Sequence, residues 1–404
     1  MANTRGNFSF TALQPLELPT ISKFKIGLCQ LSVSVDKNQN LIHAHNSIKF
    51  AAEKGARLVV LPEMWNCPYS NDYFAKYAEN FEEKDASPSF SMLSEAALSL
   101  GITIVGGSMP ECDSGKLFNT CCVFGADGKL KAKHRKVIWS KIIRYGFDFI
   151  DVDGKSQENY EKEDIEESDI FTAGDRPTMV DTEMGCIGVG ICHDIRFPEL
   201  AMLYRAKGAH LICYPGAFNI STGELLWELV QRARAADNQL FVATCSPSRE
   251  SNGSYMIWGH STLVGPVLKI LALVTLTGEI TATSGHEETV VVAEIDYSAI
   301  QLQREHIPVQ NQRRGDVYKF IRLAVGCIGH LGSPFSSVLN ACARMPAFLE
   351  GKQVQAKVVQ LGYGKCGDVS QAKRVFDEIL EPDASCWAAM VACYAQNGYA
   401  EEKY

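Results

Sequence analysis

Short apolar segments alternate with amphipathic segments along most of the chain up to residue 306. The apolar segments are typical of buried strands, and segments with apolar residues at helical spacing are typical of helices. The first unit has an apolar segment at 24–31, helical spacing at 40–54 and a second apolar segment at 57–61. An Asp-Gly pair at 127–128 predicts a β-hairpin, because this pair readily adopts the positive φ angles of a tight turn. The alternation as a whole predicts an α/β domain.

The other expected elements continue this order along the chain. Strands are predicted at 102–105, 118–124, 130–134, 186–191, 211–214, 241–245, 259–264 and 289–295. Helices are predicted at 88–100, 193–207, 224–238 and 297–306.

The segment 184–200, MGCIGVGICHDIRFPEL, has the pattern of a buried strand, a sharp turn and a helix. Cys192 lies at the turn. There the free N–H groups and the dipole of the following helix favour a thiolate, so Cys192 is a candidate nucleophile. The chain has 14 cysteines, and a buried core cysteine is the alternative interpretation. Partner residues must decide between the two.

Two charged residues at predicted strand ends are candidate partners. Glu63 follows the second strand after a proline, and reactive groups collect at the carboxyl ends of parallel strands. Lys136 ends the triplet HRK, which closes the second arm of the predicted hairpin. An exposed carboxylate and a solvated basic tip are the alternatives for these two residues. Together with a thiol they would supply a base and a cation.

The composition narrows the class of protein. A chain of 404 residues with 46% hydrophobic residues is long enough for two or three soluble domains. Its net charge of -8 argues against nucleic acid or membrane surfaces as main partners. The scattered cysteines, the lack of a membrane-length apolar run and the lack of a secretory h-region in residues 1–22 predict reduced thiols and a cytoplasmic location, with an organelle as the alternative.

Three motifs together resemble the nitrilase superfamily of carbon-nitrogen hydrolases: LPE at Glu63, HRK at Lys136 and GICHDIRFPE at Cys192. The resemblance continues through YPGAFNISTGELLWELVQRARAADNQ, WGHSTLVGP and IPVQNQRRGDVY. The flanking residues look most like the omega-amidase branch, which removes ammonia from 2-oxoglutaramate and 2-oxosuccinamate. The resemblance implies a four-layer αββα sandwich, a homodimer and a small-molecule amide of a dicarboxylic 2-oxo acid as substrate.

The residue types fit amide hydrolysis. An amide carbon is a poor electrophile, so its hydrolysis needs a strong nucleophile, a base and an oxyanion donor. We expect Cys192 to attack the amide, Glu63 to act as base, and Lys136 with the backbone N–H of His193 to hold the oxyanion. We also expect Lys136 to raise the thiolate fraction of Cys192. No metal or organic cofactor is needed, and a zinc site at Cys186, Cys192 and His193 would lack a second ligand pair.

The resemblance adds four supporting residues. Glu167 would orient Lys136 or the substrate, although it ends an acidic run that is typical of a solvated loop. Arg196, Phe218 and Asn219 would bind the carboxylate and acyl chain of the substrate. For Arg196 a plain surface charge is the alternative.

Two stretches depart from the family pattern. Residues 137–146 follow the candidate lysine directly, and the apolar stretch 268–276 interrupts a hairpin. Both stretches disturb the expected local structure, and no neighbouring residues in the sequence offset the disturbance. We therefore hypothesise that they are translated introns or gene-model errors. Sequencing the transcript across both junctions tests this hypothesis.

The last part of the chain has a different character. Residues 331–404 contain four short amphipathic segments that resemble about two pentatricopeptide repeats, fewer than the three that a stable solenoid needs. We therefore expect an extension at 1–22, a hydrolase domain at 23–318, a linker at 319–330 and a short all-α repeat tail. The alternative to an omega-amidase is a disabled fusion product with a vestigial RNA-binding-type tail, or a related amidase of different substrate.

Overall fold

A computed structural model describes residues 18–83, 86–138, 167–249, 255–266, 279–309 and 311–313. All of them belong to the first unit of the chain, Met1–Arg313. Three predictions fall outside the described residues, wholly or in large part: the extra stretch 268–276, the extra stretch 137–146 beyond residue 138, and the repeat-like tail 331–404.

Seven strands form the first sheet, in the order β13-β1-β2-β3-β5-β4, with β6 paired to β5. The strands β1, β2 and β3 run parallel to one another, and the other pairs are antiparallel. The bounds are β1 (Lys23–Gln30), β2 (Ala56–Val60), β3 (Thr103–Val105), β4 (Met109–Asp113), β5 (Lys116–Phe124), β6 (Leu130–Arg135) and β13 (Thr289–Asp296).

Six strands form the second sheet, in the order β12-β11-β10-β9-β8-β7. The central strands β8, β9 and β10 are parallel, and the flanking pairs are antiparallel. The bounds are β7 (Thr178–Thr182), β8 (Gly185–Val189), β9 (Leu211–Pro215), β10 (Phe241–Cys245), β11 (Thr262–Gly265) and β12 (Glu279–Thr283).

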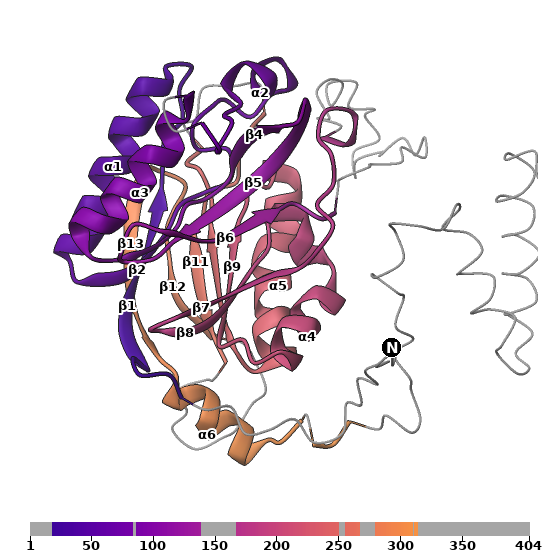
Figure 1. The fold of residues 1–404 in the computed structure, drawn as a ribbon. Coiled ribbons are helices and arrows are strands. Elements are labelled where there is room, and N and C mark those ends of the chain that lie inside the picture. The colour runs from indigo at the N-terminus through magenta and orange to yellow at the C-terminus, as the bar shows by residue number, and fades with distance from the viewer. Residues whose placement is uncertain are drawn as a thin grey trace, which may run out of the picture. The chain divides into compact units, whose positions relative to one another are not determined.

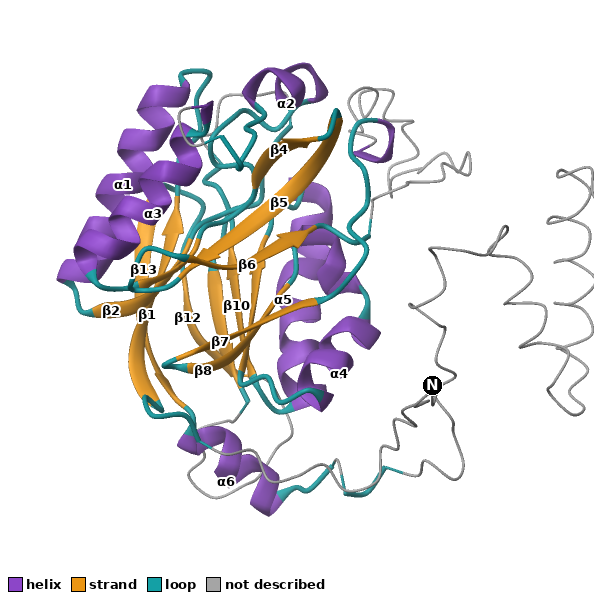
Figure 2. Ribbon diagram, viewed as in Figure 1, coloured by secondary structure: helices purple, strands orange, loops and turns teal. Residues whose placement is uncertain are grey.

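Helices cover the outer face of each sheet, as Figures 1 and 2 show. The helices α1 (Lys37–Glu53) and α3 (Pro88–Leu100) pack on the first sheet, and α4 (Pro198–Ala206) and α5 (Ile220–Asn238) lie beside the second. Two further helices, α2 (Asn71–Tyr77) and α6 (Ser298–His306), lie at the ends of the sandwich. The predicted four-layer αββα architecture is confirmed.

The alternation of side chains along the strands explains the two cores. Cys121 and Val123 on β5 belong to the core between the sheets, whereas Cys122 and Phe124 belong to the core under α1 and α3. Successive side chains of a strand point to opposite faces of its sheet. The adjacent cysteines Cys121 and Cys122 therefore face different layers, and both are free thiols.

Most predicted elements are present, including the first strand-helix-strand unit, the hairpin at Gly128 and the helix α3. Sequence reasoning missed α2, β4, β7 and β12. In β4, the charged residue Glu111 is buried because Lys133 and Arg135 pair with it, so the strand lacks a simple apolar alternation. The helix expected directly after Cys192 is instead a short 3₁₀ turn, Cys192–Arg196, followed by α4.

No helix among the described residues is both long and apolar enough to cross a membrane.

A buried carboxylate joins the two helices of the first outer layer. Glu79 is 1% exposed and accepts hydrogen bonds from the backbone N–H groups of Ser89, at 3.1 Å, and Phe90, at 3.2 Å. These donors lie in the first turn of α3, whose N-cap residue Ser87 makes no side-chain cap. Lys37 at the start of α1 pairs with the same carboxylate at 2.8 Å. Glu79 thus replaces the missing cap of α3 and ties it to α1.

We expect Glu79→Ala to lower the free energy of unfolding by about 2 kcal/mol, because it leaves buried helix N–H groups without an acceptor. Urea unfolding measured by circular dichroism checks this value. Glu82→Ala removes the same charge from an exposed position of the same loop and serves as control. Equal unfolding midpoints for the two variants would contradict the capping role.

Candidate active site

The ends of three strands bring the predicted trio together. Glu63 follows β2 and Lys136 follows β6 in the first sheet, whereas Cys192 follows β8 in the second. All three are buried, with Glu63 0%, Lys136 1% and Cys192 9% exposed. The candidate site therefore depends on the docking of one sheet against the other.

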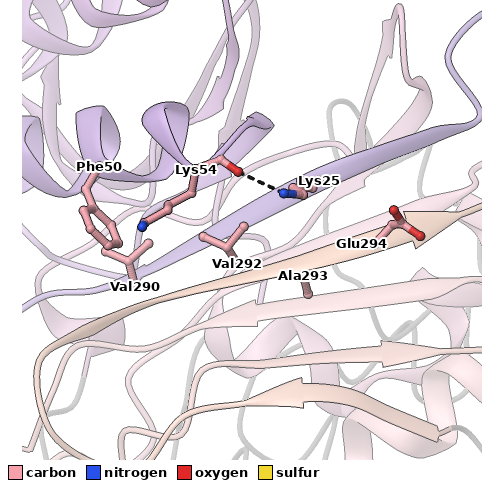
Figure 3. A pocket seen from close by; sticks show the side chains of 7 residues that line it. All are labelled: Lys25, Phe50, Lys54, Val290, Val292, Ala293 and Glu294. Atoms are coloured by element: carbon pink, nitrogen blue, oxygen red, sulfur yellow. Dashed lines mark hydrogen bonds between the residues drawn. The ribbon is translucent and has the colours of Figure 1, made fainter.

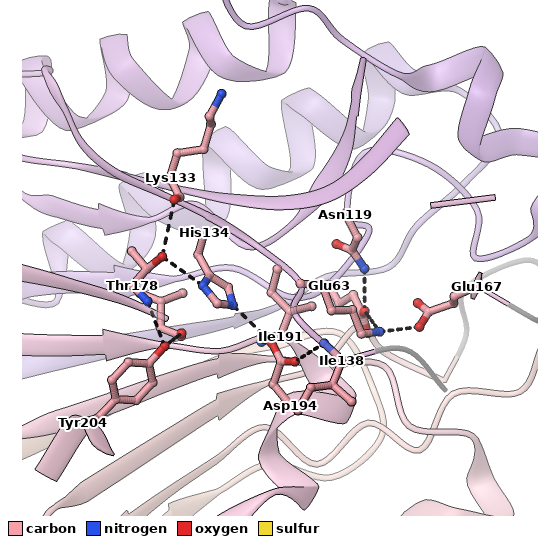
Figure 4. A network of polar contacts seen from close by, with 12 residues as sticks. Glu63, Asn119, Lys133, His134, Ile138, Glu167, Thr178, Ile191, Asp194 and Tyr204 are labelled. Carbon is pink, nitrogen blue, oxygen red and sulfur yellow. Dashed lines mark hydrogen bonds and ion pairs between the residues drawn. The ribbon is translucent and has the colours of Figure 1, made fainter. Parts of the chain in front are cut away.

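Lys136 is the centre of the polar contacts. Its Nζ donates to Oε1 of Glu63 at 3.0 Å and to Oε2 of Glu167 at 2.5 Å. Glu167 is also buried, and Figure 4 shows its carboxylate directed at this group from outside the sheets. The structure thus places the fourth predicted residue, Glu167, in contact with Lys136.

The two oxygens of Glu63 differ in their surroundings. Oε1 accepts from Lys136 and also from Nδ2 of Asn119, at 2.9 Å. Oε2 is buried and receives no nitrogen or oxygen donor from the described residues. The thiol of Cys192 lies close enough to lower the pKa of this carboxyl by hydrogen bonding. An unpaired buried oxygen beside a thiol is what a proton acceptor in catalysis requires.

The backbone at Cys192 is strained and firmly held. Its φ of 44° lies in the left-handed region, which is unfavourable for a side chain with a Cβ. Asp194 braces the turn, since Oδ2 accepts from the N–H of Ile191 and Oδ1 from the N–H of Ile138, both at 2.9 Å. Arg234 on α5 holds the far end of the turn by donating to the carbonyls of residues 195 and 196, at 2.9 and 2.8 Å.

A second buried contact links the lysine strand to the cysteine turn. His134, two residues before Lys136, has Nε2 at 3.2 Å from Oδ2 of Asp194 and Nδ1 at 3.1 Å from the hydroxyl of Thr178 (Figure 4). Because a carboxylate only accepts, Nε2 of His134 carries the proton in this contact. The strand end that carries Lys136 and the turn that carries Cys192 are thereby fixed to each other.

Burial decides the direction of the pKa shifts of Cys192 and Glu63, whereas neighbouring carboxylates decide that of Lys136. Burial and the nearby Glu63 raise the pKa of the Cys192 thiol well above its usual value, although Lys136 lowers it. Burial also raises the pKa of Glu63. For Lys136, burial opposes the charge, but Glu167 and Glu63 raise its pKa well above normal. The expected effect of Lys136 is present, because it lowers the pKa of the Cys192 thiol, but burial and Glu63 outweigh it and favour the protonated thiol in the free site.

The other predicted residues lie around the turn. The His193 ring is half-buried, and burial lowers its pKa to about 4, so the ring is neutral at pH 7. The guanidinium of Arg196 is 5.1 Å from the ring centroid of Phe218, which packs in the same apolar cluster as Cys192. Asn219 caps α5 by accepting from the N–H of Ser221 at 3.1 Å. Substrate binding by these residues stays a prediction.

Three residues near the trio were missed by sequence reasoning. Asn119 lies inside β5, and nothing in that apolar strand marks it as a partner of Glu63. Tyr69 donates to Oε1 of Glu167 at 2.8 Å, and its ring stacks on Tyr255 at 4.8 Å between centroids. Aromatic residues in loops carry no signal of this kind in a single sequence.

The described residues hold no group of three or more His, Cys, Asp or Glu side chains placed to bind a metal ion. A pocket of about 390 Å³ lies elsewhere, between α1 and strands β1 and β13. Its lining includes Phe50, Val290 and two lysines, of which Lys25 donates to the carbonyl of Lys54 at 3.1 Å (Figure 3). None of the predicted site residues lines this pocket.

Comparison with known proteins places this geometry in a family. Residues 25–305 match the model of the carbon-nitrogen hydrolases. The chain is 56% identical to "Omega-amidase, chloroplastic" of Arabidopsis thaliana over 76% of this chain and 77% of that protein. It is 48% identical to "Omega-amidase NIT2-A" of Xenopus laevis over 74% of this chain and 98% of that protein.

A solved structure agrees with these sequence matches. The structure of Nit3 from Saccharomyces cerevisiae, described as a member of branch 10 of the nitrilase superfamily, superposes with a TM-score of 0.62 at 41% sequence identity. The superposition covers 72% of this chain and 97% of Nit3. With a family match over most of its length and relatives that share about half of the aligned residues, this chain belongs to the carbon-nitrogen hydrolases of the nitrilase superfamily.

Proposed function

We propose that this protein is an omega-amidase whose hydrolase domain spans residues 23–318. It hydrolyses the terminal amide of 2-oxoglutaramate or 2-oxosuccinamate to the 2-oxo dicarboxylate and ammonia. The observation that carries this proposal is the buried carboxylate of Glu63, whose Oε2 receives no nitrogen or oxygen donor from the described residues and whose pKa the Cys192 thiol lowers by hydrogen bonding. The names of the relatives from Arabidopsis thaliana and Xenopus laevis support the choice of substrate class.

In the first half-reaction, Sγ of Cys192 attacks the amide carbon while its proton passes to Glu63. Transfer during the attack suits a thiol that burial keeps protonated, because no thiolate has to persist in the free site. Glu63 then gives this proton to the departing nitrogen, so ammonia leaves and a thioester remains. In the second half-reaction, Glu63 takes a proton from water, the hydroxide attacks the thioester, and the thiol recovers its proton.

The ammonium of Lys136 stabilises negative charge in both steps. Its pKa is raised well above normal once Glu167 and Glu63 outweigh burial, so it stays charged throughout the working pH range. We assign the oxyanion to Lys136 and the backbone N–H of His193. A preorganised donor of this type contributes roughly 3 kcal/mol to transition-state stabilisation.

The substrate carboxylate and acyl chain are assigned to residues beside the turn. Arg196 is a cation next to the ring of Phe218, so the pair offers a charged contact and an apolar contact together. Asn219 directly follows Phe218 and is the N-cap residue of α5. These three residues remain the candidates for substrate selection.

We infer that the protein is a homodimer. On the outer layer, α5 exposes Leu225 to 74% and Leu229 to 62%, and these residues lie one helical turn apart. An apolar strip on the outside of a layer is typical of a surface that a second copy covers.

We infer a reducing compartment as its location. The described residues include nine free cysteines, and a thiol nucleophile is inactivated by oxidation. The cytoplasm meets this requirement. An organelle is the second candidate, because the Arabidopsis thaliana relative is named as chloroplastic.

We expect Cys192→Ala to abolish ammonia release from 2-oxoglutaramate, with a loss of at least about 1,000-fold, because no other group can form the thioester. Cys186→Ala, which removes a thiol from β8 outside the trio, should keep near-normal activity. A coupled assay for ammonia measures both variants. Activity that survives Cys192→Ala would exclude the thioester route. Activity found only after deletion of residues 137–146 would mean that the extra stretch disables this chain.

The acid limb of the profile of kcat/KM against pH should lie above the usual glutamate pKa of about 4.3, because burial raises the pKa of the base Glu63. Activity requires the ionised base, so it falls as pH drops through that raised value. Asn119→Leu removes a hydrogen bond to the carboxylate and should move the limb to still higher pH. Asn40→Leu, a buried change on α1, is the control. An unmoved limb in Asn119→Leu would argue against Glu63 as the base.

The double variant Leu225→Glu/Leu229→Glu should be monomeric, because four carboxylates would then face one another across the proposed interface. Light scattering after gel filtration measures the mass. Leu302→Glu on α6 changes another exposed leucine, at 51%, outside that surface and should leave the dimer intact. A double variant with the mass of the wild type would place the interface elsewhere.

A further inference from the structure

Two tyrosines at the site have no role in the mechanism above. Tyr69 lies in the loop between β2 and α2, and Tyr255 lies before β11. Both are half-buried, whereas the trio behind them is buried. Their rings stack with 4.8 Å between centroids and 28° between planes. The pair therefore joins two loops that are far apart in the sequence.

The hydroxyl of Tyr69 is bonded to the support of the lysine. It donates to Oε1 of Glu167 at 2.8 Å, while Oε2 of the same carboxylate accepts from Lys136 at 2.5 Å. Glu167 belongs to a 3₁₀ turn of only three residues, Glu167–Asp169. Such a short turn orients a side chain poorly, so the bond from Tyr69 fixes how the carboxylate meets Lys136.

The hydroxyl of Tyr255 is bonded to the support of the cysteine. It donates to the carbonyl of Ala217 at 3.1 Å. The backbone N–H of Ala217 in turn lowers the pKa of the Cys192 thiol by hydrogen bonding to its sulfur. Tyr255 thus fixes the residue whose N–H faces the nucleophile.

These contacts form a closed ring. It runs from Tyr69 through Glu167, Lys136 and Glu63 to Cys192. From there it returns through Ala217 and Tyr255, which are hydrogen-bonded to each other, to the stacked ring of Tyr69. We propose that Tyr69 and Tyr255 form a tyrosine clamp, a pair of positioning residues that holds the lysine side and the cysteine side of the site in register. This proposal rests on the proposed amidase function.

The clamp has a physical reason. Lys136 comes from the first sheet and Cys192 from the second, so a small slide between the sheets changes the distance between them. A misplacement of about 1 Å in an active site can cost 100-fold in rate. In the clamp one hydroxyl is bonded to the lysine side and the other to the cysteine side, and the stacked rings join the two sides and resist such a slide.

Tyr69→Phe keeps the ring stack and removes one hydrogen bond. We expect kcat to fall about tenfold with KM within about twofold, because the bond to a charged group is lost and no substrate contact changes.

Tyr255→Phe tests the other half of the clamp without an amide substrate. We expect alkylation of Cys192 by iodoacetamide at pH 7 to slow about fivefold, the effect of one neutral hydrogen bond, because the N–H of Ala217 moves off the sulfur. The double variant should lose less kcat than the product of the single losses, because one broken contact already opens the ring.

Tyr77→Phe is the matched control. Tyr77 lies on α2 and also donates its hydroxyl to a backbone carbonyl, that of Val35, outside the site. The proposal is overturned if Tyr69→Phe lowers kcat no more than Tyr77→Phe does. It is also overturned if Tyr255→Phe slows alkylation no more than Tyr77→Phe does. A wild-type chain that releases no ammonia from the omega-amides but shows slower alkylation in Tyr255→Phe would overturn the proposed function and retain the clamp.

Discussion

The ammonium group of Lys136, buried between two carboxylates, is the interaction on which the rest of the site depends. A charge at this depth is strongly unfavourable unless opposite charges surround it. Glu63 and Glu167 supply those charges, and their own burial is tolerable because Lys136 is there. Each of these three residues, besides its candidate role in the site, therefore makes the burial of the other two tolerable. The substrate meets a polar centre that was assembled during folding.

The sandwich sets the position of this centre. The core between the sheets brings the end of β8 opposite the ends of β2 and β6, and His134 with Asp194 joins them directly. The nucleophile turn is then held at both ends, by Asp194 and by Arg234. These contacts maintain an unfavourable φ at Cys192 that its local sequence alone would not adopt. Tertiary packing, rather than helix propensity, presents the thiol.

Local patterns in the sequence were sufficient to predict an α/β domain and to bring Glu63, Lys136 and Cys192 to three strand ends, whereas the four-layer sandwich was predicted from the resemblance to the nitrilase superfamily. It failed where a contact between distant segments decides the outcome. The buried ion pairs of β4 hide its strand pattern, and the partners of Tyr69 and Tyr255 lie far away in the chain. The sequence indicated that Lys136 lowers the pKa of the thiol, but not that burial, which only the fold reveals, outweighs the nearby lysine.

The origin of the trio from two different sheets has a consequence for how activity relates to folding. Neither sheet with its own helices contains all three of the proposed catalytic groups. An intermediate in which one layer pair has formed and the other has not is therefore inert, however much secondary structure it has. The enzyme's turnover is in this sense a direct reporter of sheet docking, and catalytic competence appears during refolding only when the two halves of the sandwich meet.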